Sequence, residues 1–355
     1  MHAEPSDQSA AAAGPGDQVT HPSDGPEARP PTPRRCLGMG AAAALALLLL
    51  GPLVRPAAAS TRASAIRRAA AHEQQRVHTL DAPKAVVLGI VEGITEFLPI
   101  SSTGHLLVAD RVLGVGQTNA DRDAADSYAV AIQLGAILAV LVLYRKRIGT
   151  LFEGLVGRDE QARGILAALV VAFVPAAVIG AAFDHSIKAH LFGTWPVILA
   201  WVVGGLVILA FARNPRFQPG QPGLSIEALS LRAALIIGAA QVLSLWPGTS
   251  RSLVTLLAGL VVGLTLAAAV EFTFLLGLLT LTAATVFELA KNGKILFQAY
   301  GWVNPLVGFL VAFVAALVAI KWMIEYLKRH DLAIFGYYRL VVAAVVALLL
   351  VTNAI

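Results

Sequence analysis

Apolar residues recur in nine long segments after residue 81, and short polar connections separate them. The segments cover residues 82–100, 127–144, 164–183, 195–212, 230–246, 252–268, 271–290, 303–324 and 333–352. A helix needs roughly 20 residues to cross a bilayer. Because lipid offers the backbone no hydrogen bonds, only helices satisfy every N–H and C=O within such runs. The pattern predicts an all-α polytopic membrane protein whose embedded domain covers residues 81–355.

Residues 1–80 lack this pattern and form a separate N-terminal extension. Residues 1–33 are rich in Pro, Ala, Gly, Asp and Ser, a composition that predicts disorder. A pair of arginines, an apolar run over 40–54 and small residues at 57–60 follow in the order of a secretory signal. Three interpretations stay open: a cleaved signal, an uncleaved anchor, or translated sequence ahead of the true start.

Composition supports the membrane assignment. Of 355 residues, 57% are hydrophobic and 14% are charged, whereas soluble domains average roughly 25% charged residues. The net charge of +5 does not indicate nucleic-acid binding, because the basic residues lie in connections where they meet anionic lipid. We therefore expect membrane lipids and no nucleic acid as partners. Cys36 is the only cysteine, which excludes an internal disulfide and a cysteine-based metal cluster.

Basic residues mark one side of the membrane. They gather at 145–147, 158, 163, 213, 216, 232, 321, 328 and 329, whereas the connections 184–194 and 292–302 contain few. The positive-inside rule places the basic connections in the cytoplasm. The connections 184–194 and 292–302 are then expected to face outward.

Two apolar segments are broken in the middle by proline and hydroxyl residues. One contains Gly89, Glu92 and then Pro99; the other contains Gly238, Gln241 and then Pro247. The matched spacings suggest an internal repeat with an offset of 148 residues, taken from the two prolines. Paired interrupted segments point to an inverted repeat with a site near mid-membrane. A chance match in a chain rich in Ala, Leu and Gly stays open.

The first break contains two carboxylates, a hydroxyl cluster and a histidine. Glu92 and Glu96 are four residues apart and share a helix face. Ionised side chains at this depth each cost about 2.5–3.5 kcal/mol, so the pair suits a divalent cation or an Arg/His partnership, unless the segment is shallow and faces water. Ser101, Ser102 and Thr103 suit a helix start, whose free N–H groups attract phosphate. Simple capping is the alternative for them, and a satisfied interior histidine for His105.

The second break contains hydroxyl residues and an arginine. Thr249 and Ser250 again suit a helix start, and Arg251 can direct two donors at phosphate oxygens. An arginine that reaches the membrane interface is the alternative. Glu271 could orient Arg251, or could be a helix-starting acid favoured by the dipole. We treat Gln241 and Glu271 as supporting residues. Together the two breaks hold a complete set of groups for phosphoryl transfer.

At these residues the chain resembles the undecaprenyl-diphosphatase family, the membrane phosphatases associated with bacitracin resistance. GIVEGITEFLPISSTGHL (89–106) resembles the family's acidic motif, and LSLWPGTSRS (243–252) resembles its arginine motif. The resemblance extends over about 83–352. Two features depart from the family pattern: Leu253–Val254 replace a small Gly-Ala pair, and Gly277 stands where a proline is usual. These departures predict a narrower site or a straighter helix.

The resemblance implies a substrate, a fold and a set of catalytic positions. The substrate would be the C55 polyprenyl diphosphate and the product the monophosphate carrier for cell-wall synthesis. The fold would be an inverted-repeat bundle with two re-entrant hairpins, and its site would open to the outer face of the cell membrane. The family's proposed catalytic positions fall on Glu92, Glu96, Ser102, His105 and Arg251, with Ser101, Thr103 and Ser250 beside them.

These residues suggest a mechanism and leave alternatives. Ser102, activated by His105, would attack the terminal phosphorus and form a phosphoserine, while Arg251 clamps the diphosphate. Glu92 and Glu96 would hold Mg²⁺ or Ca²⁺, or would position His105 and Arg251; no organic cofactor is expected. Attack by water or by His105 stays open, as does a homodimer. The rival functions are a flippase for a lipid phosphate and a type 2 phosphatidic-acid phosphatase, although the latter needs a histidine soon after Arg251 and none follows until His330.

Overall fold

The computed structural model describes residues 80–117, 119–191 and 193–354. The interpretations of the N-terminal extension lie outside these residues. Apart from an isolated bridge between Leu224 and Leu264, the described chain forms helices, turns and loops. In this part of the chain, six helices are long and apolar enough to cross a membrane. The structure is an all-α polytopic membrane protein, as the hydrophobic pattern predicts.

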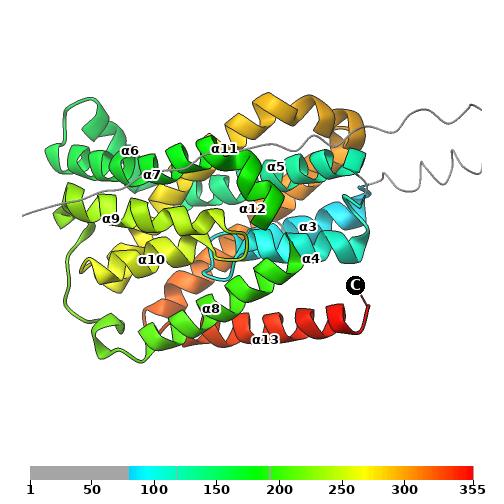
Figure 1. Ribbon diagram of the computed structural model, residues 1–355. Helices are drawn as coiled ribbons and strands as arrows, with labels where there is room; N and C mark the ends of the chain where they lie inside the picture. The colour runs from blue at the N-terminus through cyan, green and yellow to red at the C-terminus, as the bar shows by residue number, and fades with distance from the viewer. Residues whose placement is uncertain (1–79, 118, 192, 355) are drawn as a thin grey trace, which may run out of the picture. The chain divides into compact units, whose positions relative to one another are not determined.

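The described helices follow the predicted segments closely (Figure 1). They are α3 (Ala82–Thr95), α4 (Ser102–Leu113), α5 (Asn119–Leu143), α6 (Arg145–Leu155), α7 (Glu160–Leu191), α8 (Thr194–Ala212), α9 (Leu231–Gln241), α10 (Arg251–Val261), α11 (Leu266–Tyr300), α12 (Val303–Leu327) and α13 (Ala333–Val351). Short 3₁₀ turns lie at Pro215–Phe217, Ile226–Ala228 and Val242–Leu245.

Three differences from the sequence prediction concern polar or glycine-containing stretches. The basic connection after α5 forms the helix α6. The connections 184–194 and 292–302 are largely helical, because α7 continues to Leu191 and α11 to Tyr300. The predicted run 252–268 is divided, since Gly263 has a positive φ of 99° and ends the turn between α10 and α11.

The short helices α3 and α4 form a re-entrant hairpin. Asn304 donates to the carbonyl of Leu80, which precedes α3. Asp121 accepts from the N–H of Gly116, just after α4, and from Tyr300 at the end of α11. Both ends of the hairpin therefore lie near the connection between α11 and α12, and its tip lies inside the bundle.

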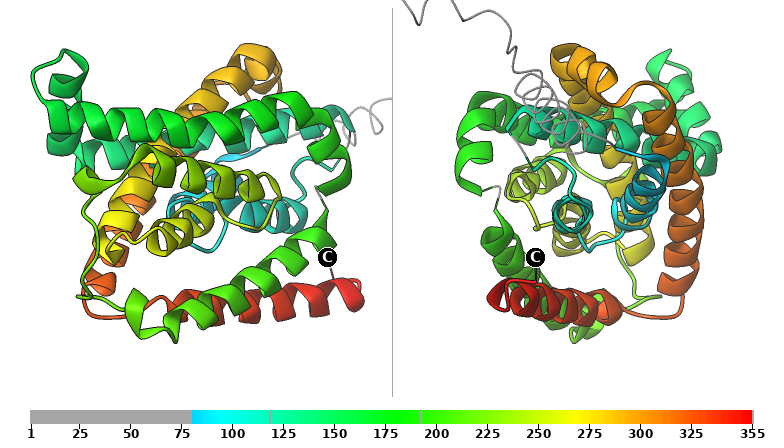
Figure 2. Two further views of the ribbon diagram at one scale, coloured as in Figure 1. Left: turned by 60° about the vertical axis from the view of Figure 1, so that its left-hand side comes forward. Right: turned by 90° about the vertical axis from the view of Figure 1, so that its right-hand side faces the viewer.

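The helices α9 and α10 form a second hairpin that enters from the other end. Leu224, ahead of α9, exchanges two backbone hydrogen bonds with Gly263 and Thr265, after α10. Nearby, Arg147 pairs with Glu227 and with Glu271 at the start of α11. Because α11 has 35 residues and is about 52 Å long, its two ends lie at opposite ends of the bundle. The two hairpins therefore approach each other from opposite sides, as an inverted repeat requires (Figures 1 and 2).

Two serines with positive φ, one at each hairpin tip, give a more accurate offset between the two repeats than the prolines do. Ser101 and Ser250 have positive φ angles of 75° and 76° and cap α4 and α10. These positions are 149 residues apart, and so are Glu92 and Gln241. The offset of 148 taken from the prolines is wrong by one residue, because the two tip loops place their proline differently.

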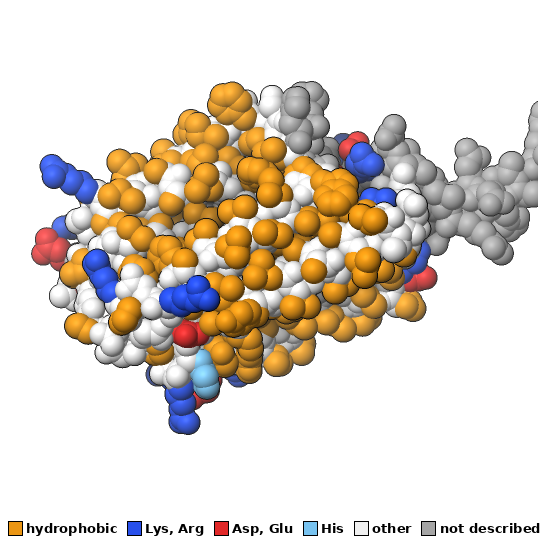
Figure 3. Space-filling model, turned by 60° about the horizontal axis from the view of Figure 1, so that its bottom comes forward, with side chains coloured by type: hydrophobic (Ala, Val, Ile, Leu, Met, Phe, Trp, Pro, Cys, Tyr) orange, Lys and Arg blue, Asp and Glu red, His pale blue; other side chains and the backbone are white. Residues whose placement is uncertain are grey.

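Each hairpin packs against a helix of the other repeat. α3 packs on α12 and α9 packs on α7. Gly89 and Gly93 of α3 lie against the backbone of α12, and a Cβ at Gly89 would lie 2.6 Å from the carbonyl oxygen of Gly308. Small residues of this kind let membrane helices approach closely. On the outside, hydrophobic side chains cover most of the visible face, and charged side chains lie mainly toward its margins (Figure 3).

Candidate functional site

The two hairpin tips meet inside the bundle and hold each other by hydrogen bonds. Ser252 at the start of α10 donates to the carbonyl of Leu98 in the first tip at 2.9 Å. Its hydroxyl also lies 3.0 Å from that of Ser250. Residues of the two sequence breaks, 154 positions apart for Ser252 and Leu98, are thereby brought to one place.

Glu96 is the centre of this meeting point. Its Oε2 accepts a hydrogen bond from Ser102 Oγ, and its Oε1 accepts from Arg251 Nη2 at 3.0 Å. Glu96 is 6% exposed, and charge-assisted bonds of this kind are the strong ones in proteins. The carboxylate of the first repeat therefore links the hydroxyl of its own hairpin to the cation of the other.

Arg251 is held in place on three sides but keeps one donor unused. Its Nη1 donates to the carbonyl of Thr273 at 3.0 Å, and its guanidinium lies over the Phe97 ring at 5.2 Å. Its Nε is buried and has no hydrogen-bond partner. Gly277 of α11 provides the room, because a Cβ there would collide with the guanidinium. The glycine that departs from the family pattern therefore accommodates the arginine.

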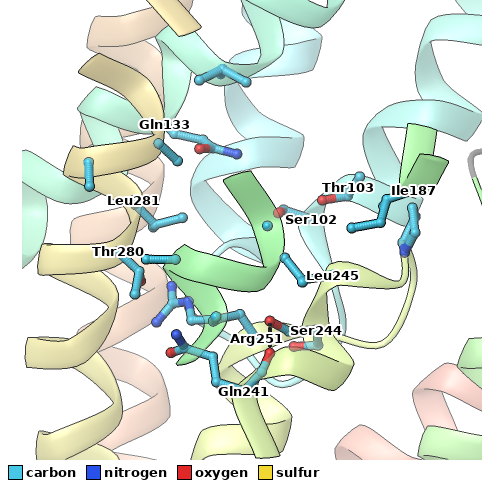
Figure 4. A pocket seen from close by; sticks show the side chains of 18 of the residues that line it. Ser102, Thr103, Gln133, Ile187, Gln241, Ser244, Leu245, Arg251, Thr280 and Leu281 are labelled. Carbon is cyan, nitrogen blue, oxygen red and sulfur yellow. Dashed lines mark hydrogen bonds between the residues drawn. The ribbon is translucent and has the colours of Figure 1, made fainter. Parts of the chain in front are cut away.

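A cavity of about 500 Å³ lies beside this cluster. Its lining includes Glu96, Ser101, Ser102, Thr103, Gln241, Ser250 and Arg251. Figure 4 shows Arg251 and Gln241 together on one wall, with Ser102 and Thr103 further along. Leu253 and Val254 do not line this cavity, and Leu253 is buried in the core. The expectation that these two residues narrow the site is therefore wrong for this cavity.

The cavity extends from the hairpin tips toward one end of the bundle. It is lined by α7 as far as Ile187 and by α11 as far as Glu288, toward the ends of these helices at Leu191 and Tyr300. The basic end, with Arg147 and Glu227, has a separate small pocket of about 90 Å³. The larger cavity therefore lies on the side away from the basic connections.

His105 does not reach Ser102, so the expected pair of nucleophile and base is not formed. Its Nδ1 lies 2.6 Å from the carbonyl oxygen of Ser101, and its Nε2 lies 2.9 Å from the hydroxyl of Tyr338. Because a carbonyl only accepts, Nδ1 carries a hydrogen. The ring also contacts Trp201 and stacks on Tyr338. His105 ties α4 to α13, and the group that contacts Ser102 Oγ is Glu96.

Glu92 lies one helical turn before Glu96 and is completely buried. Neither of its carboxyl oxygens has a hydrogen-bond partner. An ionised carboxylate in such a place is costly without a partner. In the described residues, no group of three or more His, Cys, Asp or Glu side chains could hold a metal ion. Since the Glu96 oxygens face Ser102 and Arg251, the two glutamates do not form an all-protein cage for a divalent cation, and one or two carboxylates would hold Mg²⁺ only together with waters and substrate phosphates.

Glu271 lies away from Arg251, contrary to expectation. Its Oε1 accepts from Arg147 Nε at 2.5 Å, and Arg147 also pairs with Glu227 at 2.9 Å. The hydrogen bond with Glu271 raises the pKa of Arg147. The cluster joins α6, the linker between the repeats and α11 at the basic end. Thr249 likewise lies outside the cavity lining, and its carbonyl accepts from Arg339.

We expect Glu271→Gln to leave turnover within about twofold of wild type and to lower stability by roughly 1 kcal/mol, the scale of a partly exposed ion pair. Phosphate release and thermal unfolding in detergent measure the two effects. A loss of turnover without a loss of stability would contradict this assignment.

Arg339 of α13 belongs to the site although it is not among the residues predicted from the sequence. It is completely buried, and its guanidinium donates to five backbone carbonyls, those of Pro99, Ala200, Trp201, Gly248 and Thr249. Pro99 belongs to one hairpin tip and Gly248 and Thr249 to the other. A signal was present in the sequence, because an arginine inside an apolar segment marks a functional site by default.

Comparison with known proteins gives matches over most of the membrane domain. The family model described as "Bacitracin resistance protein BacA" matches residues 85–345. An undecaprenyl-diphosphatase of Sorangium cellulosum is 47% identical over 263 residues, which are 74% of this chain and 84% of the relative. Undecaprenyl-diphosphatase 2 of Rhodospirillum rubrum is 46% identical over 263 residues, 74% of this chain and 93% of the relative. An undecaprenyl-diphosphatase of Aquifex aeolicus is 40% identical over 264 residues, 74% and 96% of the two chains.

Proposed function

Because this chain belongs to the bacitracin resistance protein BacA family, we propose that it hydrolyses undecaprenyl diphosphate to the monophosphate and inorganic phosphate. The reaction would recycle the lipid carrier for cell-wall synthesis and confer resistance to bacitracin. The observation that carries the proposal is the contact of Glu96 with both Ser102 and Arg251 at the wall of a cavity. This contact supports the proposal because the groups proposed as nucleophile, base and phosphate clamp lie together.

In the proposed first step, Ser102 is the nucleophile and Glu96 is the base. The Ser102 hydroxyl proton passes to Glu96 Oε2 as Oγ bonds to the terminal phosphorus. The bond from this phosphorus to the bridging oxygen breaks, and the lipid monophosphate leaves with the proton from Glu96. Arg251 and the N-termini of α4 and α10 stabilise the negative charge on the phosphoryl oxygens.

In the proposed second step, water hydrolyses the phosphoserine. Glu96 accepts a proton from the water as its oxygen bonds to phosphorus. The bond between phosphorus and Ser102 Oγ breaks, and Oγ regains a proton from Glu96. Inorganic phosphate then leaves. His105, bonded to Ser101 and Tyr338, supports the strained tip of the first hairpin in this scheme.

The proposed orientation has the cavity facing the outside of the cell membrane. The cavity lies away from the basic connections, which the positive-inside rule places in the cytoplasm. The apolar walls from α7 and α11 suit the first isoprene units of the lipid, while the polar tips suit the diphosphate.

The test of this function is release of phosphate from a polyprenyl diphosphate in detergent. Wild type is expected to release phosphate, and Ser102→Ala and Arg251→Ala are expected to lower turnover by about 10²-fold or more. Unchanged turnover in both variants would refute the site. Exchange of labelled lipid between leaflets without any phosphate release would favour the flippase instead.

A divalent cation, if turnover requires one, is proposed to arrive on the phosphates of the substrate. We expect a chelator to act by removing the cation from the diphosphate of the substrate, so that added Mg²⁺ restores turnover at once. Calorimetry with Mg²⁺ alone is expected to show no binding to substrate-free protein. Tight binding to wild type that disappears in Glu92→Gln would contradict this prediction and restore the two glutamates as a metal site.

A further inference from the structure

Gln241 is the last residue of α9 and carries a buried polar atom that has no role in the two proposed reaction steps. The residue is 1% exposed and lines the cavity, yet its side-chain Oε1 has no hydrogen-bond partner. Its backbone carbonyl is already occupied by the hydroxyl of Ser244 at 2.6 Å. An unpaired buried acceptor costs about 1–3 kcal/mol, so folded proteins keep few of them.

Comparison of the two repeats shows how Gln241 differs from the residue at the equivalent position. Gln241 corresponds to Glu92 of the first repeat, and both lie one turn before a hairpin tip. Glu92 is not part of the cavity lining, whereas Gln241 is. A carboxamide keeps an acceptor at this place without adding a negative charge beside the phosphates of the substrate.

The groups around Gln241 indicate which ligand would donate a hydrogen bond to its unpaired Oε1. Its side chain points toward α11 beside that of Arg251 in Figure 4, and Arg251 Nε is the other buried polar atom of this wall without a partner. An ionised oxygen of the phosphoryl group can accept from Arg251 Nε but has no hydrogen to donate to Gln241 Oε1. Oε1 needs a hydrogen-bond donor, and the water that the hydrolytic reaction consumes supplies one.

We propose that Gln241 binds the water molecule that attacks phosphorus. Oε1 accepts a hydrogen bond from one O–H of the water. This bond directs a lone pair of the water oxygen at the phosphorus of the phosphoryl group that Arg251 binds. The other water proton passes to Glu96 as the O–P bond forms. A glutamine is chemically suited to this task, because it orients water without competing as a base. The inference rests on the proposed phosphatase function.

The test is competition between water and methanol as acceptors of the phosphoryl group. The purified full-length protein is given a polyprenyl diphosphate in methanol–water mixtures, and methyl phosphate and inorganic phosphate are both measured. In Gln241→Ala we expect phosphate release to fall by about tenfold or more, while methyl phosphate formation is largely kept. The ratio of methyl phosphate to phosphate therefore rises. Gln133→Ala, the same truncation on another wall of the same cavity, is expected to keep the wild-type ratio.

A wild-type ratio in Gln241→Ala overturns the proposal, whatever the total rate. A folded Gln241→Ala that forms neither product also overturns it, because loss of a water-binding group leaves transfer to methanol open. If Gln241→Ala does not fold, Gln241→Asn replaces it, and its shorter amide is expected to give a ratio above wild type. Absence of phosphate release by wild type would refute the phosphatase function itself, a result distinct from an unchanged ratio.

Discussion

Glu96→Gln is expected to reduce the turnover of polyprenyl diphosphate by about 10³-fold, within the range for loss of a general base. The substitution keeps the size of the side chain but removes its charge and its ability to take the Ser102 proton. It also weakens the bond to Arg251 Nη2, so the phosphate clamp loses its orientation. Phosphate release at saturating substrate measures the effect as a fall in kcat.

Two further variants separate this role from a general effect on the membrane domain. Glu271→Gln is the same substitution on a carboxylate that pairs with Arg147 at the basic end, and it is expected to remain active. His105→Gln removes the ring that joins Ser101 to Tyr338, and it is expected to cost about tenfold. If His105→Gln loses as much kcat as Glu96→Gln, the assignment of Glu96 as the base is wrong.

The overall architecture could be predicted because membrane helices have strong local signals. The long apolar runs became helices, with the run 252–268 divided between α10 and α11, and the two breaks became hairpin tips at the hydroxyl residues named from sequence. Ser101 and Ser250 cap α4 and α10, as their residue type and position predict. The amphipathic helix α6 was missed, because its charged residues resemble a cytoplasmic connection.

The partners within the site could not be read from sequence spacing. Ser102 and His105 are three residues apart, a spacing that allows contact on one helix face. Instead, the tip loop returns Glu96 to Ser102, and His105 turns toward Tyr338, 233 positions away. Arg251 likewise finds Glu96 across 155 positions and avoids Glu271, which lies much closer in sequence. Tertiary packing decides these pairings, and it depends on how the two hairpins meet.

The contacts of Arg339 likewise depend on tertiary packing. The local pattern offers it no acid and no motif, since all five of its acceptors are backbone carbonyls on α8 and the two tips. A helix break leaves carbonyls without intrahelical partners. In lipid, where water cannot supply donors, a single guanidinium with five N–H groups can satisfy several of them at once.

Arg339→Leu is therefore expected to lower the stability of the membrane domain by about 3 kcal/mol, because several buried carbonyls lose their donor and each costs about 1–3 kcal/mol before relaxation. Gly204 of α8 makes room for the guanidinium, since a Cβ there would collide with it. Gly204→Val, which displaces the guanidinium but leaves Arg339 in the sequence, is expected to reproduce much of this loss of stability. Thermal unfolding in detergent measures both variants, and Arg329→Leu, at an exposed position, serves as the matched control.

Arg339→Lys distinguishes a positioning role from simple stabilisation. Its ammonium has three donors in place of five. It therefore cannot donate hydrogen bonds to the carbonyls of α8 and of both hairpin tips together. We expect a stability between those of wild type and Arg339→Leu, and a fall in kcat with little change in KM, because Glu96 and Arg251 approach each other only when the tips are in register. A lysine variant with reduced stability and wild-type kcat at a temperature where it stays folded would show that Arg339 supports the fold alone.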